Sequence, residues 1–317
     1  MKRRAFSVML SLILVLAMLA GCGNNAVDKS PSTQPANSQE NASGEKTPAA
    51  ASSVTITYAL WDSNQAVGFE KMAAEFTEKN PGIKIEIQLN GWSDYWTALD
   101  AAASAGTLPD TFWMHSNNFY RYASNDMLMT LDSLIASSDR IDLKNYPEGL
   151  VSLYNHNGKQ YCIPKDFDTI GLWYNKTMFD EAGLEYPDDT WTWNDLYEAA
   201  RKLTKPDKSQ YGFLAPLHNQ EGFYNFIYQN GGTVITPDKK SGYDDPRTIE
   251  AMEYYVKFVK EGLSPVIFGD AERAEAMQNG LCAMGFFGSW NLSGFAANEY
   301  MAKNFDVTVL PAAPDGG

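Results

Sequence analysis

The chain has 317 residues, and its 39 Asp and Glu residues outnumber its 25 Lys and Arg residues. The formal net charge is −14, and because the first 53 residues carry +2, residues 54–317 carry −16. So acidic a chain argues against a nucleic-acid partner and against binding to an anionic membrane surface. Residues 54–317 are long enough for one large domain or two smaller lobes.

Residues 1–21 have the layout of a secretory signal peptide. Basic residues at positions 2–4 precede an apolar run, and small residues precede Cys22. The run is shorter than the roughly 20 residues that a membrane-spanning helix needs, which disfavours a transmembrane helix. Leu19–Cys22 resembles the bacterial lipobox, and this resemblance implies cleavage before Cys22 and a lipid on that cysteine that anchors the protein to the cell membrane. Gly23 is compatible with a Gram-positive cell.

Residues 22–53 are rich in Ser, Asn, Ala, Pro and Thr and have almost no large apolar side chain. Such a segment cannot bury enough surface to offset the entropy lost on ordering, so we expect a flexible tether between lipid and folded chain. After the tether only two cysteines remain, Cys162 and Cys282. Their apolar surroundings favour free, buried thiols over a disulfide.

Strands and helices alternate after the tether. Three segments rich in β-branched or aromatic residues are predicted strands: Val54–Leu60, Ile83–Ile87 and Thr111–Met114. An apolar period of three and four over residues 69–76 predicts a helix between the first two strands, and residues 93–104 favour a second helix. This alternating order predicts a largely parallel sheet with helices on its faces.

The pattern restarts in the second half of the chain. Extended segments are predicted at residues 161–164, 169–174, 211–215, 281–286 and 307–310. Helices are predicted over residues 175–182 and along residues 249–263. Thr192 is expected to cap another helix, because Asp195 stands three residues later in the position of a capping box. The second half therefore predicts a further α/β unit.

Four motifs follow one another in the order found in a known family. They are Asn157–Pro164, Leu172–Gly183, Thr190–Leu196 and Ala283–Trp290. With these motifs behind a lipobox, the chain resembles the bacterial extracellular solute-binding proteins of the sugar-binding group (family 1), the relatives of maltose-binding protein. The similarity runs from Val54 to the last residue.

The resemblance implies an α/β fold of the two-lobe, periplasmic-binding-protein-like kind (class II type). Lobe one would comprise residues 54–165 and lobe two residues 166–308, with residues 309–317 starting a return crossing to lobe one. Further strands and helices follow in the family, so the C-terminal part of lobe one is expected to be missing. The lobes would close around a solute by a hinge motion, and the protein, a monomer, would present that solute to the permease subunits of an ABC transporter.

Sugars carry hydroxyl groups at their ring edges and C–H groups on their faces, so a sugar site combines aromatic rings with polar groups. Residues of both kinds follow the predicted strands, and open α/β sheets bind ligands at the ends of strands. We predict ten ligand-binding residues: Trp61, Asp62, Trp113, His115, Ser116, Asn117, Asp168, Phe223, Tyr224 and Trp290. Trp92 and Tyr95 could border the same cleft.

The resemblance supports only part of this set. It aligns ligand-contacting positions of maltose-binding protein with Trp113, Asp168, Phe223 and Trp290. Ser116 and Asn117 stand where that relative has a charged pair, so maltose itself is not carried over. Structural roles are the alternatives: a core position for a tryptophan, or a solvated loop charge for an aspartate. Small residues around Trp290 favour an accessible ring face.

Catalytic chemistry has little support in the sequence. The three histidines lack metal-ligand spacing, and the chain has neither a G-x-S-x-G elbow nor a glycine-rich phosphate loop. We therefore expect no enzymatic activity, no metal and no cofactor. Two alternatives to a carbohydrate-binding protein stay open. A polyamine or other non-sugar ligand would suit the acidic charge, and a glycosidase could use two of Asp62, Asp166 and Asp168.

Overall fold

The structure, a computed structural model, describes residues 53–314. The predicted signal peptide, nearly all of the tether and the lipid attachment at Cys22 lie outside the described residues. The described residues, 53–314, belong to one compact unit. Within the described part, none of the helices has the length and apolar character needed to span a membrane.

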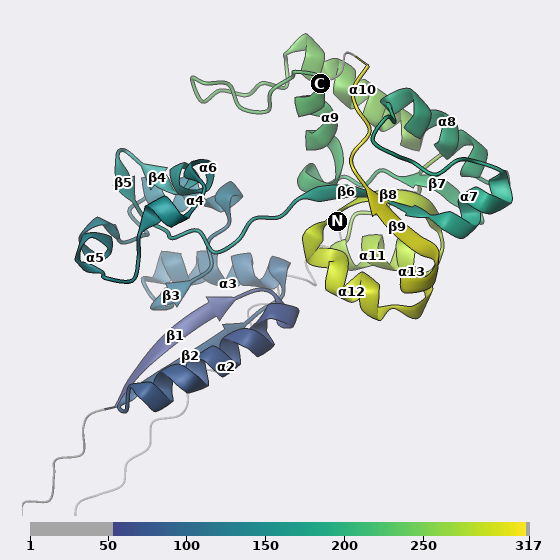
Figure 1. The fold of residues 1–317 in the computed structure, drawn as a ribbon. Helices are drawn as coiled ribbons and strands as arrows, with labels where there is room; N and C mark the ends of the chain where they lie inside the picture. Colours follow the sequence, from purple (N-terminus) through teal and green to yellow (C-terminus); the bar gives the residue numbers. More distant parts are fainter. Residues whose placement is uncertain (1–52, 315–317) are drawn as a thin grey trace, which may run out of the picture. The chain divides into compact units, whose positions relative to one another are not determined.

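The first sheet is parallel throughout, as the alternation of strands and helices predicted. It has the order β2-β1-β3, with β1 at Val54–Leu60, β2 at Ile83–Leu89 and β3 at Thr111–Phe112 (Figure 1). Helices α2 (Ser63–Lys79) and α3 (Trp92–Ala105) connect these strands. The strand β3 is shorter than predicted because His115 already caps the next helix, although the Trp113 N–H still donates to the Ala59 carbonyl at 3.0 Å.

Short elements that the sequence did not predict complete the first half. They are α4 (Ser116–Ser124), α5 (Asp132–Ser137), the 3-10 helix η2 (Leu143–Asn145), α6 (Glu148–Leu153), and a hairpin of β4 (Asn155–His156) and β5 (Lys159–Gln160). Asn157 and Gly158 turn this hairpin with φ angles of 52° and 77°, in the left-handed region that a tight hairpin turn requires. An extended segment was predicted at residues 161–164, but residues 161–169 have neither helix nor strand.

The second sheet has the order β7-β8-β6-β9 and mixes directions. Its strands are β6 (Ile170–Asn175), β7 (Tyr211–Leu214), β8 (Cys282–Gly288) and β9 (Phe305–Thr308). The pair β7 and β8 is parallel, whereas β6 runs antiparallel to both β8 and β9. All residues of β8 are buried, as expected for a strand covered on both faces.

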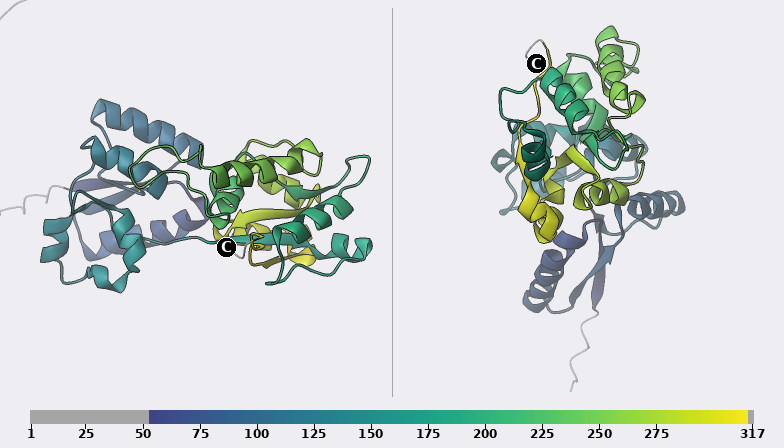
Figure 2. Two further views of the ribbon diagram at one scale, coloured as in Figure 1. Left: turned by 90° about the horizontal axis from the view of Figure 1, so that it is seen from above. Right: turned by 90° about the vertical axis from the view of Figure 1, so that its right-hand side faces the viewer.

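Two apolar clusters cover the opposite faces of the second sheet, and Figure 2 shows helices on both sides of it. Successive residues of one strand face opposite ways, so Phe286 belongs to one cluster and Phe287 to the other. The first cluster includes side chains of α8 (Trp193–Leu203), α9 (Tyr224–Gln229) and α10 (Pro246–Lys260). The second includes side chains of α11 (Asp270–Gln278), α12 (Leu292–Ala297) and α13 (Glu299–Asn304). Each fully buried large side chain stabilises the fold by roughly 1.5–3 kcal/mol.

Several local signals in this half are confirmed. Thr192 and Asp195 form the predicted capping box of α8. Helix α7 (Lys176–Ala182) begins after Asn175 and ends at Gly183, which has a φ of 62°. Helix α10 begins earlier than predicted because Asp245 caps it with Pro246 in its first turn.

The cysteine prediction is partly wrong. Cys162 and Cys282 are free thiols, as expected, but Cys162 is only partly buried. Burial raises the pKa of each thiol to about 12. At neutral pH both groups are therefore protonated and unreactive.

Candidate functional site

Side chains from both halves of the chain line a pocket of about 360 Å³. Six of the ten residues predicted to bind ligand are among them: Trp61, Asp62, Trp113, His115, Asp168 and Trp290. Trp92, at the first turn of α3, also lines the pocket. These residues share a pocket because most of them lie immediately after a strand, where open α/β sheets form their ligand sites.

An aromatic cluster forms one wall of this pocket. Trp61 follows β1 directly, and its ring meets Trp92 at 5.2 Å, Trp113 at 5.0 Å and Tyr95 at 5.2 Å between centroids. These edge-to-face contacts hold the Trp61 ring in place while part of it stays exposed. Tyr95 is buried and donates its hydroxyl to the Trp113 carbonyl.

Trp113 is the least accessible of the three tryptophans in this wall. It is 5% exposed, and its indole N–H donates to the Tyr58 hydroxyl at 3.0 Å. The ammonium group of Lys165 lies 4.0 Å from the ring centroid, within cation–π distance. Trp113 therefore serves mainly as a core residue at the floor of the pocket, which was one of the two predicted alternatives.

The acidic residues of the pocket accept hydrogen bonds within the protein. Asp62 caps α2: its Oδ1 accepts from the backbone N–H groups of Asn64 at 2.7 Å and Gln65 at 3.1 Å. Asp168 is exposed, and its Oδ1 accepts from the Ser289 hydroxyl at 2.6 Å. A carboxylate has about four acceptor positions, so each keeps acceptor capacity toward the pocket.

His115 has a structural role as well as a place in the pocket. Its Nδ1 accepts from the Asn117 N–H at 3.1 Å and caps α4. In the neutral ring the proton is therefore on Nε2, which lies 3.5 Å from the side-chain nitrogen of Gln220. Burial lowers the pKa of His115, and the charges of Asp168 and Asp166 oppose this shift.

Trp290 lies in η4 (Ser289–Asn291), immediately after β8, and is half-buried. A Cβ atom at Gly288 would lie 1.9 Å from Cζ3 of the Trp290 ring. The ring therefore lies directly against a backbone that has no side chain. The absence of a side chain at Gly288 thus leaves space for the Trp290 ring. A Cβ at Gly294, by contrast, would meet open space.

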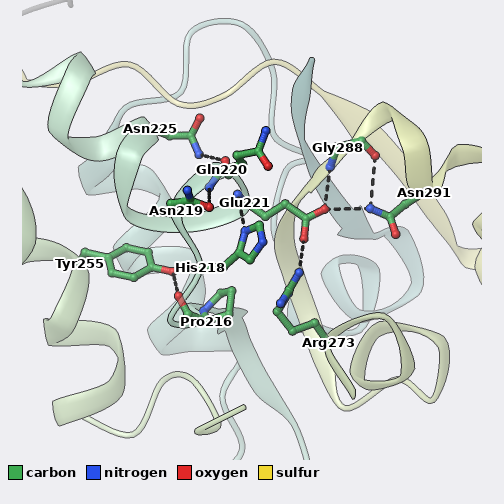
Figure 3. A network of polar contacts seen from close by, with 10 residues as sticks. All are labelled: Pro216, His218, Asn219, Gln220, Glu221, Asn225, Tyr255, Arg273, Gly288 and Asn291. Atoms are coloured by element: carbon green, nitrogen blue, oxygen red, sulfur yellow. Dashed lines mark hydrogen bonds and ion pairs between the residues drawn. The ribbon is translucent and has the colours of Figure 1, made fainter. Parts of the chain in front are cut away.

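A buried ion pair that the sequence did not predict lies next to Trp290. Arg273 in α11 contacts Glu221 at 2.9 Å, and their side chains are 5% and 2% exposed (Figure 3). Glu221 also accepts hydrogen bonds from the Gly288 N–H at 3.0 Å and the Asn291 side-chain amide at 2.8 Å. Burial raises the pKa of Glu221, and these donors oppose the shift. Five of the labelled residues line the pocket: His218, Gln220, Glu221, Arg273 and Asn291.

The family model for "Bacterial extracellular solute-binding protein" matches residues 62–317. The chain belongs to this family. Members of the family are binding proteins that act outside the cytoplasm. The two-lobe fold expected from the sequence is that of solved solute-binding proteins.

Similar proteins include relatives of known sequence and solved structures, some of them with named ligands. A putative binding protein of Brucella abortus is 24% identical over 274 residues, covering 84% of this chain and 65% of that protein. The arabinooligosaccharide-binding protein of Bacillus subtilis is 21% identical and matches over 70% of its length. A Listeria monocytogenes ABC substrate-binding protein, solved with cycloalternan, is 28% identical with a TM-score of 0.73, covering 83% of this chain and 67% of that one. The chain thus spans 65% of the Brucella relative.

Four of the predicted site residues of this solute-binding protein lie elsewhere. Phe223 and Tyr224 are half-buried and pack against the core of the second sheet. They do so because the π-helix η3 (Asn219–Phe223) kinks at Gly222, which directs Glu221 rather than the following rings to the pocket. Ser116 and Asn117 are exposed in the first turn of α4, and neither lines this pocket.

The sequence gives little indication of the ion pair between Glu221 and Arg273. Glu221 stands in a polar run that is typical of a loop, and its partner Arg273 lies 52 residues later. The site has no metal centre among the described residues. Within that part of the chain, no group of three or more His, Cys, Asp or Glu side chains could hold a metal ion.

Proposed function

We propose that this solute-binding protein captures a carbohydrate in the pocket described above and delivers it to the permease of an ABC importer. The observation that carries the proposal is the pocket itself, in which the accessible rings of Trp61, Trp92 and Trp290 are combined with acceptors on Asp62 and Asp168. Flat rings match the C–H faces of a sugar, and carboxylates accept hydrogen bonds from its hydroxyl groups. Relatives named for arabino- and galactooligosaccharides support this ligand class.

The remaining sequence predictions belong to this proposal. Residues 54–165 would form lobe one and residues 166–308 lobe two, with residues 309–317 beginning a return to lobe one. The protein would be a monomer outside the cytoplasm, anchored to the membrane of a Gram-positive cell through lipid on Cys22. The family resemblance and the lipobox support these points.

We also propose that the protein does not act on its ligand. A glycosidase needs one carboxylic acid that donates a proton and a second carboxylate across the sugar bond. Here Asp62 caps a helix, Asp168 accepts from Ser289, and Asp166 is paired with Lys165. Each carboxylate is thus held as an acceptor. Sugar recovered unchanged after long incubation is the expected result, whereas new reducing ends would establish hydrolysis.

The test of the binding role is a titration of the protein with mono- and oligosaccharides, followed by calorimetry and tryptophan fluorescence. With the sugar that binds, Trp290→Ala is expected to weaken affinity about tenfold or more, because a stacked ring contributes on the order of 1–2 kcal/mol. Trp290→Phe, which keeps a ring face, should retain most of the affinity.

The matched control is Tyr228→Ala, which removes an exposed aromatic side chain on α9 away from the pocket. It should bind like the wild type. Unchanged affinity in a folded Trp290→Ala variant would contradict the proposed role of the ring. Saturable binding of a non-sugar solute, with none of any sugar, would contradict the ligand class.

A further inference from the structure

We infer that Glu221 is a positioning residue that holds the Trp290 ring in its binding orientation. The inference rests on the proposed function, because Trp290 is the ring expected to meet the sugar. Glu221 forms hydrogen bonds to the turn that carries Trp290, and its proposed effect on the ring acts through that turn.

One oxygen atom of Glu221 closes the turn on which Trp290 stands. Its Oε1 accepts from the Gly288 N–H at 3.0 Å and from the Asn291 side-chain amide at 2.8 Å. These two residues directly flank Ser289 and Trp290, so a single atom bonds both ends of the turn (Figure 3). The Trp290 ring lies against Gly288, and its orientation therefore depends on where these bonds hold the Gly288 backbone.

The other carboxylate oxygen fixes Glu221 itself. Oε2 accepts from Arg273 at 2.9 Å, with both side chains almost fully buried. A bond to a charged donor is stronger than one between neutral groups, so the carboxylate has a fixed direction. The ion pair thus connects α11 to the turn that carries Trp290.

The backbone behind Glu221 is held equally firmly. Its N–H donates to Nδ1 of His218 at 3.0 Å. The next residue, Gly222, has a non-helical conformation, and a Cβ there would lie 2.6 Å from the Tyr255 hydroxyl. That hydroxyl donates to the Pro216 carbonyl at 2.7 Å. Only glycine fits this kink, and the kink is what directs the carboxylate toward Gly288.

A simple truncation of Glu221 would break a buried ion pair by removing one of its two partners, which destabilises proteins strongly. Two double variants avoid this problem, because both remove the ion pair. Glu221→Gln with Arg273→Met keeps an oxygen that can accept from Gly288 and Asn291. Glu221→Met with Arg273→Met keeps the volume but removes that oxygen.

The position of the ring is measured without ligand. Tryptophan is replaced biosynthetically by 5-fluorotryptophan, and the ¹⁹F resonance of residue 290 is assigned with Trp290→Phe. The double variant with Gln is expected to keep the wild-type resonance, and the double variant with Met is expected to shift or broaden it. An unchanged resonance in the folded Met variant would overturn the inference.

Sugar affinity is the second readout. The Met double variant is expected to bind at least about fivefold more weakly than the Gln double variant. A Trp290 ring that is already oriented loses less conformational entropy when the sugar binds. If neither double variant folds, Asn291→Leu removes one of the two bonds with the ion pair intact, and the resonance of residue 290 must again move. A shifted resonance in a protein that binds no sugar would support the role of Glu221 and reject the proposed function.

Discussion

Gly288 shows how one missing side chain controls a neighbouring ring. A Cβ atom at this position would lie within 2.2 Å of three atoms of Trp290, all on the ring. Gly288→Ala should therefore displace the ring and weaken sugar binding about fivefold, since an aromatic contact on the order of 1 kcal/mol would be lost. Near-UV circular dichroism reports the displacement, and calorimetry reports the affinity.

Gly294 provides the matched control at the same scale. A Cβ there meets nothing within 4 Å, and alanine is the better helix former at a position within α12. Gly294→Ala should bind sugar like the wild type and unfold at the same or a slightly higher temperature. If both alanine variants bind equally well, Trp290 does not need the space above Gly288.

His115 makes helix α4 sensitive to pH. Its Nδ1 can cap the helix only when unprotonated, and burial lowers its pKa below the ordinary value of about 6.5. In the window between the folded and unfolded pKa values the unfolded chain binds more protons, so stability rises with pH there. Acidification from about pH 7 should therefore lower the free energy of unfolding by up to the value of a cap, on the order of 1 kcal/mol.

The test at this scale is His115→Asn, which keeps an oxygen for the cap but does not titrate. Asparagine is a good N-cap residue, so the variant should be as stable as the wild type at pH 7. Its melting temperature should change less between about pH 7 and pH 5 than that of the wild type. Equal slopes for the two proteins would show that His115 does not contribute.

Elements with strong local signals were predictable, and those fixed by distant contacts were not. The capping box of α8 and the glycine that ends α7 depend on residues within one turn. The π-helix η3 depends instead on Tyr255, more than thirty residues away, against which Gly222 packs. This explains why Phe223 does not line the pocket, although the sequence grouped it there with Trp290. The buried charge of Glu221 was missed for the same reason.

The same difference between local and distant contacts applies to strand direction in the two sheets. Strands joined by single helices gave the parallel sheet β2-β1-β3, because such connections impose a parallel order. In the second sheet β6 pairs with β8 and β9, which lie more than a hundred residues later. No local pattern specifies such pairing, so the antiparallel direction of β6 was not anticipated.

The acidic charge of the molecule separates the two candidate ligand classes. Affinity for a neutral sugar should change less than about twofold between low and high salt, because ionic screening acts on charged partners. Spermidine is a cation and is attracted by the net charge of −16 on residues 54–317. Its affinity should therefore fall more than about tenfold at high salt. Titration of both ligands at the two salt concentrations decides between them, and strongly salt-dependent sugar binding would be the unexpected result.

The position of β6 between β8 and β9 also determines how the second sheet bears mechanical load. The segment 161–169 continues directly into Ile170, the first residue of β6, and both neighbouring ladders are antiparallel. A pull along that segment acts parallel to the strand and across hydrogen bonds that lie perpendicular to it. The bonds of two ladders must then yield together rather than one after another. Tension on the segment is thus transmitted to an inner strand of the sheet rather than to its edge.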